Sequence, residues 1–252
     1  MRSRRVGILA ALTVLVGAGL VLALSDDGSP PHRDAQVSLP SSALPTGPFY
    51  QLPSAEIARE AIRATKALKT VRVMTTIQEE DFAVSYDVRR AANATCFGHV
   101  TVNRRTASLI ATKDHTYLRG PASFWRLLKA PNVSDEMAST PWLWARLPKN
   151  TELQLLCDVP RLLKKLDLDL DALGRLRSGP PYPGGTEGRI IVDLTDQDSN
   201  IEFKVDVAPP HYIVQVQEDE GTVDLSEFNE PATVRLPSER EYVPFRDASV
   251  EI

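Results

Sequence analysis

Apolar and polar residues alternate in short stretches along most of the chain after residue 70. The first stretch covers residues 71–77 and the second residues 82–88, and the acidic residues 79–81 lie between them. A period of two is typical of strands with one buried face, and a short polar turn joins antiparallel neighbours. The pattern therefore predicts an antiparallel meander at the start of the domain.

Similar alternation recurs towards the C-terminus. The further predicted strands cover residues 96–102, 107–112, 116–119, 141–147, 189–194, 201–207, 212–217, 222–228 and 233–236. Together the stretches predict about ten strands. Turn residues such as Asn103 and Asp114 separate several of them, which favours antiparallel pairing throughout.

Helical patterns occur in three places. Ser54 is a candidate N-cap, and the residues that would share one face of the first helix are Ile57, Ala61, Ala64 and Leu68. A short helix is expected at 123–129, and a longer helical region at 152–173 is expected to break near Pro160.

A large antiparallel sheet with few helices forms either a closed sandwich or barrel, or a curved sheet whose concave side the helices cover. The amphipathic first helix favours the second architecture, because its apolar face needs a surface to cover. We therefore predict an α+β fold, a half-barrel of about ten strands with helices over its concave face. The side chains predicted to line an apolar cavity there are Ile57, Ala61, Leu68, Val73, Phe82, Val84, Trp125, Trp142 and Trp144.

The N-terminal segment, residues 1–25, has the pattern of an export signal. Arginines at positions 2, 4 and 5 precede an uncharged apolar run that extends to Leu24. As a helix this run would span about 28 Å, enough to be retained as a membrane anchor. Small residues at 23–25 equally suit cleavage by a signal peptidase. Both alternatives place the remaining chain outside the cytoplasm, either anchored to the cytoplasmic membrane or secreted.

The rest of the chain divides by composition. Residues 26–52 are rich in Pro, Ser and Gly and lack an apolar period, which predicts a disordered tether. Residues 53–245 form the predicted domain, and residues 246–252 a C-terminal tail. The two cysteines, Cys96 and Cys157, both lie in the exported part, where a disulfide is expected and two separate buried thiols are the alternative.

Charge and motifs exclude several function classes. The net charge of −4 argues against nucleic-acid binding. The four histidines show no paired metal-ligand spacing, and no catalytic elbow, phosphate loop or dinucleotide fingerprint occurs. Asp167, Asp169 and Asp171 match the start of a calcium loop, but Ala172 replaces the required glycine. We therefore expect no enzyme activity, no metal and no cofactor.

The order of several short motifs resembles the actinobacterial LppX/LprAFG-like lipoproteins, which have the curved-sheet fold of the LolA and LolB carriers. The resemblance covers roughly residues 54–245. The segments that carry it are 67–71 (ALKTV), 96–100 (CFGHV), 114–119 (DHTYLR), 124–125 (FW), 142–147, 156–158 (LCD) and 231–237 (PATVRLP). The lipidated cysteine of those lipoproteins is absent, so a retained helix or secretion must replace the acyl anchor.

The resemblance implies a protein of the cell envelope that carries or senses the acyl chains of lipids or lipoproteins, and we expect it to be a monomer. The first hypothesis is a lipid carrier with an open apolar cavity. The second is an envelope sensor or interaction module that has the same fold, a filled core and a protein partner. A hydrolase is a third class, and it lacks a candidate nucleophile and base. The partners expected are therefore acyl chains, the membrane through the N-terminal segment, and an envelope protein under the second hypothesis.

Overall fold

The structure, a computed structural model, describes residues 48–79, 82–128, 139–148, 151–165, 175–184, 188–196, 201–218 and 221–244. The export segment 1–25, most of the tether, the tail 246–252 and the three aspartates at 167–171 lie outside these ranges. None of the helices in the described ranges has the length and hydrophobicity that a bilayer span requires. The described strands form one open, mostly antiparallel sheet of 13 strands.

The first half of the sheet is an antiparallel meander in chain order. Its strands are β1 (Val71–Glu79), β2 (Phe82–Arg90), β3 (Cys96–Val102), β4 (Arg105–Ala111), β5 (His115–Arg119) and β6 (Trp144–Pro148). The tight turn between β3 and β4 places Asn103 and Arg104 at positive φ, which is tolerated best by Asn and Gly. The predicted meander is confirmed.

The second half is built in the same way. Its strands are β7 (Leu176–Ser178), β8 (Tyr182–Gly184), β9 (Arg189–Asp196), β10 (Glu202–Asp206), β11 (Ile213–Glu218) and β12 (Gly221–Ser226). Strands β7 and β8 both pair with β9. The last strand, β13 (Tyr242–Pro244), returns to the first half and pairs in parallel with β6.

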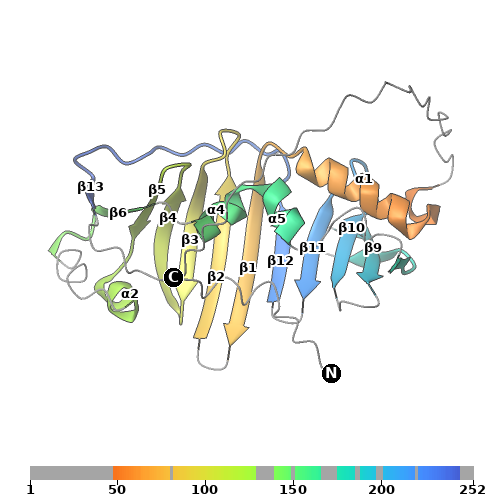
Figure 1. Ribbon diagram of the computed structural model, residues 1–252, viewed down its shortest axis with the longest axis horizontal. Helices are drawn as coiled ribbons and strands as arrows, with labels where there is room; N and C mark the ends of the chain where they lie inside the picture. The colour runs from red at the N-terminus through yellow and green to blue at the C-terminus, as the bar shows by residue number, and fades with distance from the viewer. Residues whose placement is uncertain are drawn as a thin grey trace, which may run out of the picture.

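Pairing of β1 with β12 joins the two halves, from Arg72 opposite Ser226 to Ile77 opposite Gly221. This pairing leaves β6 near one edge of the sheet and β7 at the other edge. With strands about 4.8 Å apart, the chain between β6 and β7 must travel on the order of 50 Å across the sheet. The connection carries the helices α4 (Thr151–Cys157) and α5 (Val159–Lys165), and they lie across one face (Figure 1).

The helix α1 (Ser54–Lys66) covers the same face over the second half of the sheet (Figure 1). It follows Pro53 and has no side-chain cap, so the expected capping role of Ser54 is wrong. Its buried residues are Ile57, Ala58, Ala61, Ile62 and Thr65. The Thr65 hydroxyl oxygen accepts a hydrogen bond of 2.9 Å from the backbone N–H of Ile213, which fixes α1 to the start of β11. The short helix α2 (Ala122–Leu127) contacts β4.

Residues just before α1 also contact the core. Phe49–Gln51 form a 3-10 helix, and Phe49 and Leu52 pack against the core cluster. The Phe49 ring stacks on His211, with ring centroids 3.7 Å apart. The sequence analysis assigned these residues to the tether, whereas their side chains are part of the folded domain.

The segment between β12 and β13 differs from the prediction. Residues 231–238 form no strand, although alternation predicted one at 233–236. The segment runs along the ends of the strands towards β13 (Figure 1). It is held at both ends, because Asn229 and Glu230 bond to Thr70 and the backbone N–H of Trp144 donates to the Glu241 carbonyl. A segment that crosses strand ends has no neighbour with which to form a ladder.

Gly98 lies in β3 opposite Val88 of β2. A Cβ atom at this position would lie 2.0 Å from the Asp87 carbonyl oxygen, and the residue has φ of +155°. The close backbone approach therefore requires glycine.

We predict that Gly98→Ala lowers the free energy of unfolding by more than about 1 kcal/mol, because backbone must move to admit the methyl group. Urea denaturation followed by circular dichroism measures the change. Gly179→Ala is the matched control, because no atom lies within 4 Å of an added Cβ there. Equal stability of the two variants would contradict the assignment.

Candidate functional site

One continuous apolar layer separates the sheet from α1, α4 and α5. On the sheet side it contains Val73 of β1, Val100 of β3 and Leu109 of β4. The helices contribute side chains of the same kind, which are Ile57, Ala61, Ile62, Leu153, Leu155, Leu156, Val159, Leu162 and Leu163. This layer lies where the sequence analysis predicted an apolar cavity between sheet and helices.

The centre of the layer is filled by side chains. Ile57, Val73 and Leu163 each have 0% exposed surface, so no void that holds a water molecule adjoins them. Slight exposure remains at Ile77 and Val84, which are partners across β1 and β2. An acyl chain can enter the described part of the layer only if side chains or helices move apart.

Two hydroxyl groups interrupt the apolar surface of the sheet. Thr75 of β1 and Thr116 of β5 are both buried, and each lies two residues from a core residue, Val73 or Leu118, so it shares the face of that residue. In the described part of the chain neither side-chain oxygen has a hydrogen-bond partner. A buried hydroxyl without a partner is costly, roughly 1–3 kcal/mol, so each would gain a hydrogen bond from a polar atom admitted beside it if the neighbouring side chains moved apart.

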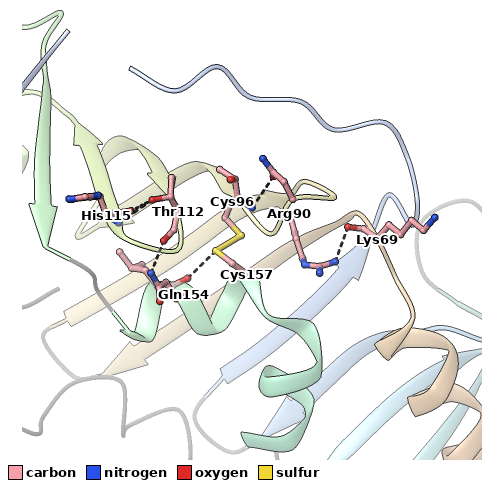
Figure 2. Close-up of a disulfide and its surroundings, with 10 residues drawn as sticks. Lys69, Arg90, Cys96, Thr112, His115, Gln154 and Cys157 are labelled. Atoms are coloured by element: carbon pink, nitrogen blue, oxygen red, sulfur yellow. Dashed lines mark hydrogen bonds between the residues drawn. A yellow bond between two sulfur atoms is a disulfide. The ribbon is translucent and has the colours of Figure 1, made fainter. Parts of the chain in front are cut away.

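Helix α4 is fastened to the sheet by a disulfide and by hydrogen bonds (Figure 2). Cys157 at its end is bonded to Cys96 of β3, with the Cα atoms 5.5 Å apart. The side-chain amide of Gln154 donates to the carbonyl oxygens of Thr112 and Lys113, at 2.6 and 3.0 Å. The predicted disulfide is confirmed, and it attaches α4 to the first half of the sheet.

Helix α5 is attached through other helices. It packs against α1 and α4. Asp158 separates α4 from α5, and its carboxylate accepts a hydrogen bond of 3.1 Å from the backbone N–H of Arg161. Asp158 thus caps the first turn of α5 while the preceding residue is bound to the sheet. Rotation at Asp158 would move α5 without breaking the attachments of α4.

The structure brings together six of the side chains predicted to line the site. Ile57, Ala61, Leu68, Val73, Val84 and Trp125 belong to the same core cluster. Trp125 is fully buried, and its indole N–H donates to the Gly120 carbonyl at 3.1 Å. The side chain of Phe82 lies outside the described residues. The leucines of α4 and α5 were not named in the prediction, although the apolar pattern of 152–173 contained them.

Two predicted lining residues lie elsewhere. Trp142 is 64% exposed, and Trp144 lies beneath the guanidinium of Arg119, 4.5 Å from the ring centroid. Ala145, the next residue in β6, is fully buried in the core, and successive strand residues face opposite sides. Trp144 therefore faces away from the helices. Placing the two tryptophans in the cavity was wrong, because arginine stacking stabilises one of them on the outer face.

The described residues contain no group of three or more His, Cys, Asp or Glu that could hold a metal ion. His99 is exposed on β3, His115 tilts against Tyr117, and His211 stacks on Phe49. The ring contacts of His115 and His211 are with aromatic side chains.

The outer face of the sheet carries a hollow of about 700 Å³ over the second half. Its lining mixes apolar and charged groups, including Met74, Tyr182, Arg189, Lys204, Asp224 and Phe228. The Arg189 guanidinium lies 3.3 Å from Asp206 and stacks 5.4 Å above the Phe228 ring. Burial and a hydrogen bond to Asp193 raise the pKa of Tyr182 to about 12. The phenol therefore stays protonated and donates to Asp193 at neutral pH.

An ion-pair network borders this hollow. Both oxygens of Asp87 accept hydrogen bonds of 2.7 Å from Arg72. Arg72 also lies 3.2 Å from Glu227, and Arg89 lies 2.6 Å from the same carboxylate. The hydrogen bonds from Arg72 lower the pKa of Asp87 and raise the pKa of Arg72. The network joins β1, β2 and the end of β12, and it neutralises the cations that border the hollow.

We predict that replacing both cysteines, Cys96→Ala with Cys157→Ala, lowers the free energy of unfolding by roughly 2–4 kcal/mol, because the closed loop is long. Chemical denaturation measures the loss, and the oxidised and reduced wild-type proteins are the controls. Hydrogen exchange should rise in α4 more than in β1 and β2. Equal midpoints for the oxidised and reduced proteins would contradict a stabilising bond.

We predict that the stabilising effect of Asp87 depends on pH. Its folded pKa lies below the unfolded value of about 3.9, so its contribution is present above that value and is lost as pH falls through the folded pKa. Asp87→Asn should therefore destabilise at pH 7 and have little effect in acid. Because Arg72 and Asp87 are partly exposed, the difference should not exceed about 1 kcal/mol. Asp114→Asn, in an exposed turn, is the control for the pH series.

Comparison with known protein families and with curated proteins finds no match. Among solved structures, the chain is similar to LprF from Mycobacterium bovis, with 15% identity, a TM-score of 0.47 and coverage of 73% of this chain and 97% of that one. It is also similar to the Mycobacterium tuberculosis lipoprotein LppX, with 15% identity, a TM-score of 0.43 and coverage of 72% and 97%. An uncharacterised conserved protein from Thermus thermophilus has 8% identity, a TM-score of 0.34 and coverage of 75% and 98%. LppX, one of these solved structures, bears the name of the lipoprotein family that the sequence analysis found the chain to resemble.

Proposed function

We propose that this protein is an extracytoplasmic binding protein of the cell envelope that takes up acyl chains of a lipid or lipoprotein between the sheet and the helices. The observation that carries the proposal is the apolar layer, which contains two buried threonine hydroxyls that have no hydrogen-bond partner among the described residues. Hydrocarbon would suit the layer, and an ester or hydroxyl group would suit Thr75 or Thr116. The proposed role is binding and carriage, without catalysis.

Uptake by this route is an exchange of one apolar contact for another. A chain with about 15 methylene groups gains roughly 12 kcal/mol on leaving water. Lifting α5 exposes side chains such as Val159, Leu162 and Leu163, at a cost of roughly 1.5–3 kcal/mol for each. The gain and the cost are of the same order, so the layer can close when it is empty and open around a guest.

The moving part in this proposal is α5. The disulfide and Gln154 keep α4 on β3 and on the β4–β5 turn, and the Thr65 bond keeps α1 on β11. Helix α5 packs on these two helices and begins directly after Asp158. Among the polar contacts of the described residues, movement of α5 therefore breaks fewer attachments to the sheet than movement of α4 or α1 would.

Lipid extraction and a binding assay test the proposal. The full chain is purified in cholate, a detergent without an acyl chain, and its extract is analysed by mass spectrometry. Uptake of a fluorescent fatty acid is then compared between Leu163→Ala and Lys164→Ala. Leu163 is fully buried and Lys164 is exposed on the same helix.

We expect an acyl lipid in the wild-type extract and severalfold tighter binding of the fatty acid by Leu163→Ala, because the guest fills the space that the leucine leaves. Lys164→Ala should bind as the wild type does, and it also corrects for lipid held by the N-terminal apolar segment. An extract without lipid, together with equal fatty-acid signals in all three proteins, would overturn the proposal.

A second function is favoured by one specific observation. The described centre of the layer is filled, with 0% exposure at Ile57, Val73 and Leu163. A filled core suits an envelope sensor or interaction module whose partner binds an outer surface. The same experiment separates the two functions. An interaction module would yield an extract without lipid, and Leu163→Ala would not change its fatty-acid signal.

A further inference from the structure

A group of aromatic and arginine side chains lies on the outer face at the β5–β6–β13 edge of the sheet. The strand register places Tyr117 opposite Arg146, and Trp144 beside Tyr242. Ala145 and Leu147, the alternate residues of β6, belong to the core. The group therefore faces away from the helices and from the proposed lipid site.

The rings and guanidinium groups are stacked on one another. Arg119 lies 4.5 Å above Trp144, and Arg146 lies 4.6 Å above Tyr242. Arg146 also donates a hydrogen bond of 2.8 Å to the Tyr242 hydroxyl. Tyr117 meets the edge of Tyr242, with ring centroids 5.6 Å apart. Stacking fixes the direction of each guanidinium at little cost in conformational entropy on binding.

Beneath these side chains the outer face is closed. Tyr117 and Ile110 of the neighbouring strand are buried, although neither belongs to the main core cluster. Burial, followed by the neighbouring Tyr242, raises the pKa of Tyr117, so it stays neutral. The layer beneath the arginines is therefore made of buried, uncharged side chains.

The two arginines differ from the other cations of the outer face. Arg72 and Arg189 pair with Asp87 and Asp206. Arg119 and Arg146 contact no carboxylate within the described ranges, where their contacts are aromatic. The surface is therefore locally positive on a chain whose net charge is −4.

Trp142 is an exposed apolar residue in the turn that leads into this surface. It lies two residues before Trp144, and it is 64% exposed. An indole prefers the level of lipid headgroups, where its ring leaves water and its N–H still finds a partner. Arginine binds phosphate oxygens in the same zone. A tryptophan and two arginines that contact no carboxylate of the described residues together match the boundary between water and an anionic bilayer.

We propose that the Trp–Arg surface, formed by Arg119, Trp142, Trp144, Arg146 and Tyr242, docks on a bilayer rich in anionic phosphate headgroups. The inference does not rest on lipid uptake between the sheet and the helices. The outer hollow takes no part in the proposed docking, because its arginines, Arg72 and Arg189, are already paired with carboxylates.

Quenching of Trp142 fluorescence tests the proposal. The full chain is reconstituted in phosphatidylcholine vesicles with and without phosphatidylglycerol, and both contain a lipid with a spin label on its headgroup. The signal of interest is the fluorescence that Trp142→Phe removes. We expect quenching on the anionic vesicles, loss of quenching at raised salt, and little quenching on phosphatidylcholine alone.

The charge requirement is tested with matched pairs of arginines. The variant Arg119→Gln with Arg146→Gln should reduce the docking equilibrium about 30-fold, because each arginine near the surface contributes roughly fivefold. Arg119→Gln alone removes no hydrogen bond found in the described ranges and should cost roughly fivefold. The control is Arg104→Gln in the β3–β4 turn with Arg105→Gln at the start of β4, both exposed, and it should dock as the wild type does.

Two results would overturn the proposal. One is unquenched Trp142 on the anionic vesicles, which would leave a protein or glycan partner for this surface. The other is equal quenching on both kinds of vesicle and in both double variants, which would show that the signal comes from the N-terminal apolar segment. Extracts of the variant Arg119→Gln with Arg146→Gln are also analysed for lipid. Lipid in these extracts would show that the variant has lost docking and has kept acyl-chain binding.

Discussion

Pairing of β1 with β12 is the constraint on which the architecture depends. It makes one sheet from two meanders, and it sends β6 and β7 to opposite edges. The chain between them has to cross a whole face, and that crossing places α4 and α5 over it (Figure 1). Had the meanders been joined at β6 and β7, the connection could have been a short turn and the face would have lacked these helices. The apolar layer is thus a product of strand order.

Within the layer, attachment and apolar packing have separate effects. The disulfide holds α4 on the first half of the sheet, and the Thr65 hydroxyl holds α1 on the second half. Apolar contact then fills the space between them without selecting a single arrangement, because the hydrophobic effect is not directional. This division allows a layer to be well attached at its ends and adaptable between them.

Much of the fold followed from alternation, because a strand with one buried face repeats every two residues. Alternation could not predict which strands are neighbours, and it wrongly predicted a strand at 233–236, where no edge is available for pairing. It also does not reveal which face of a strand meets the core, so Trp144 was assigned to the wrong side. The contact of Arg119 with Trp144 joins two strands that are distant in sequence. Nor could the sequence reveal that the hydroxyls of Thr75 and Thr116 lack a partner among the described residues, because threonine is common in any strand.

The contacts at the start of the described chain determine how the domain would bear mechanical load. Phe49 stacks on His211, and α1 is bonded to Ile213 through Thr65. Tension applied at the N-terminal end would therefore pass into the start of β11 before it reached β1, which follows α1 in the chain. The second half of the sheet would carry the force first, while the half that holds the disulfide would be shielded from it.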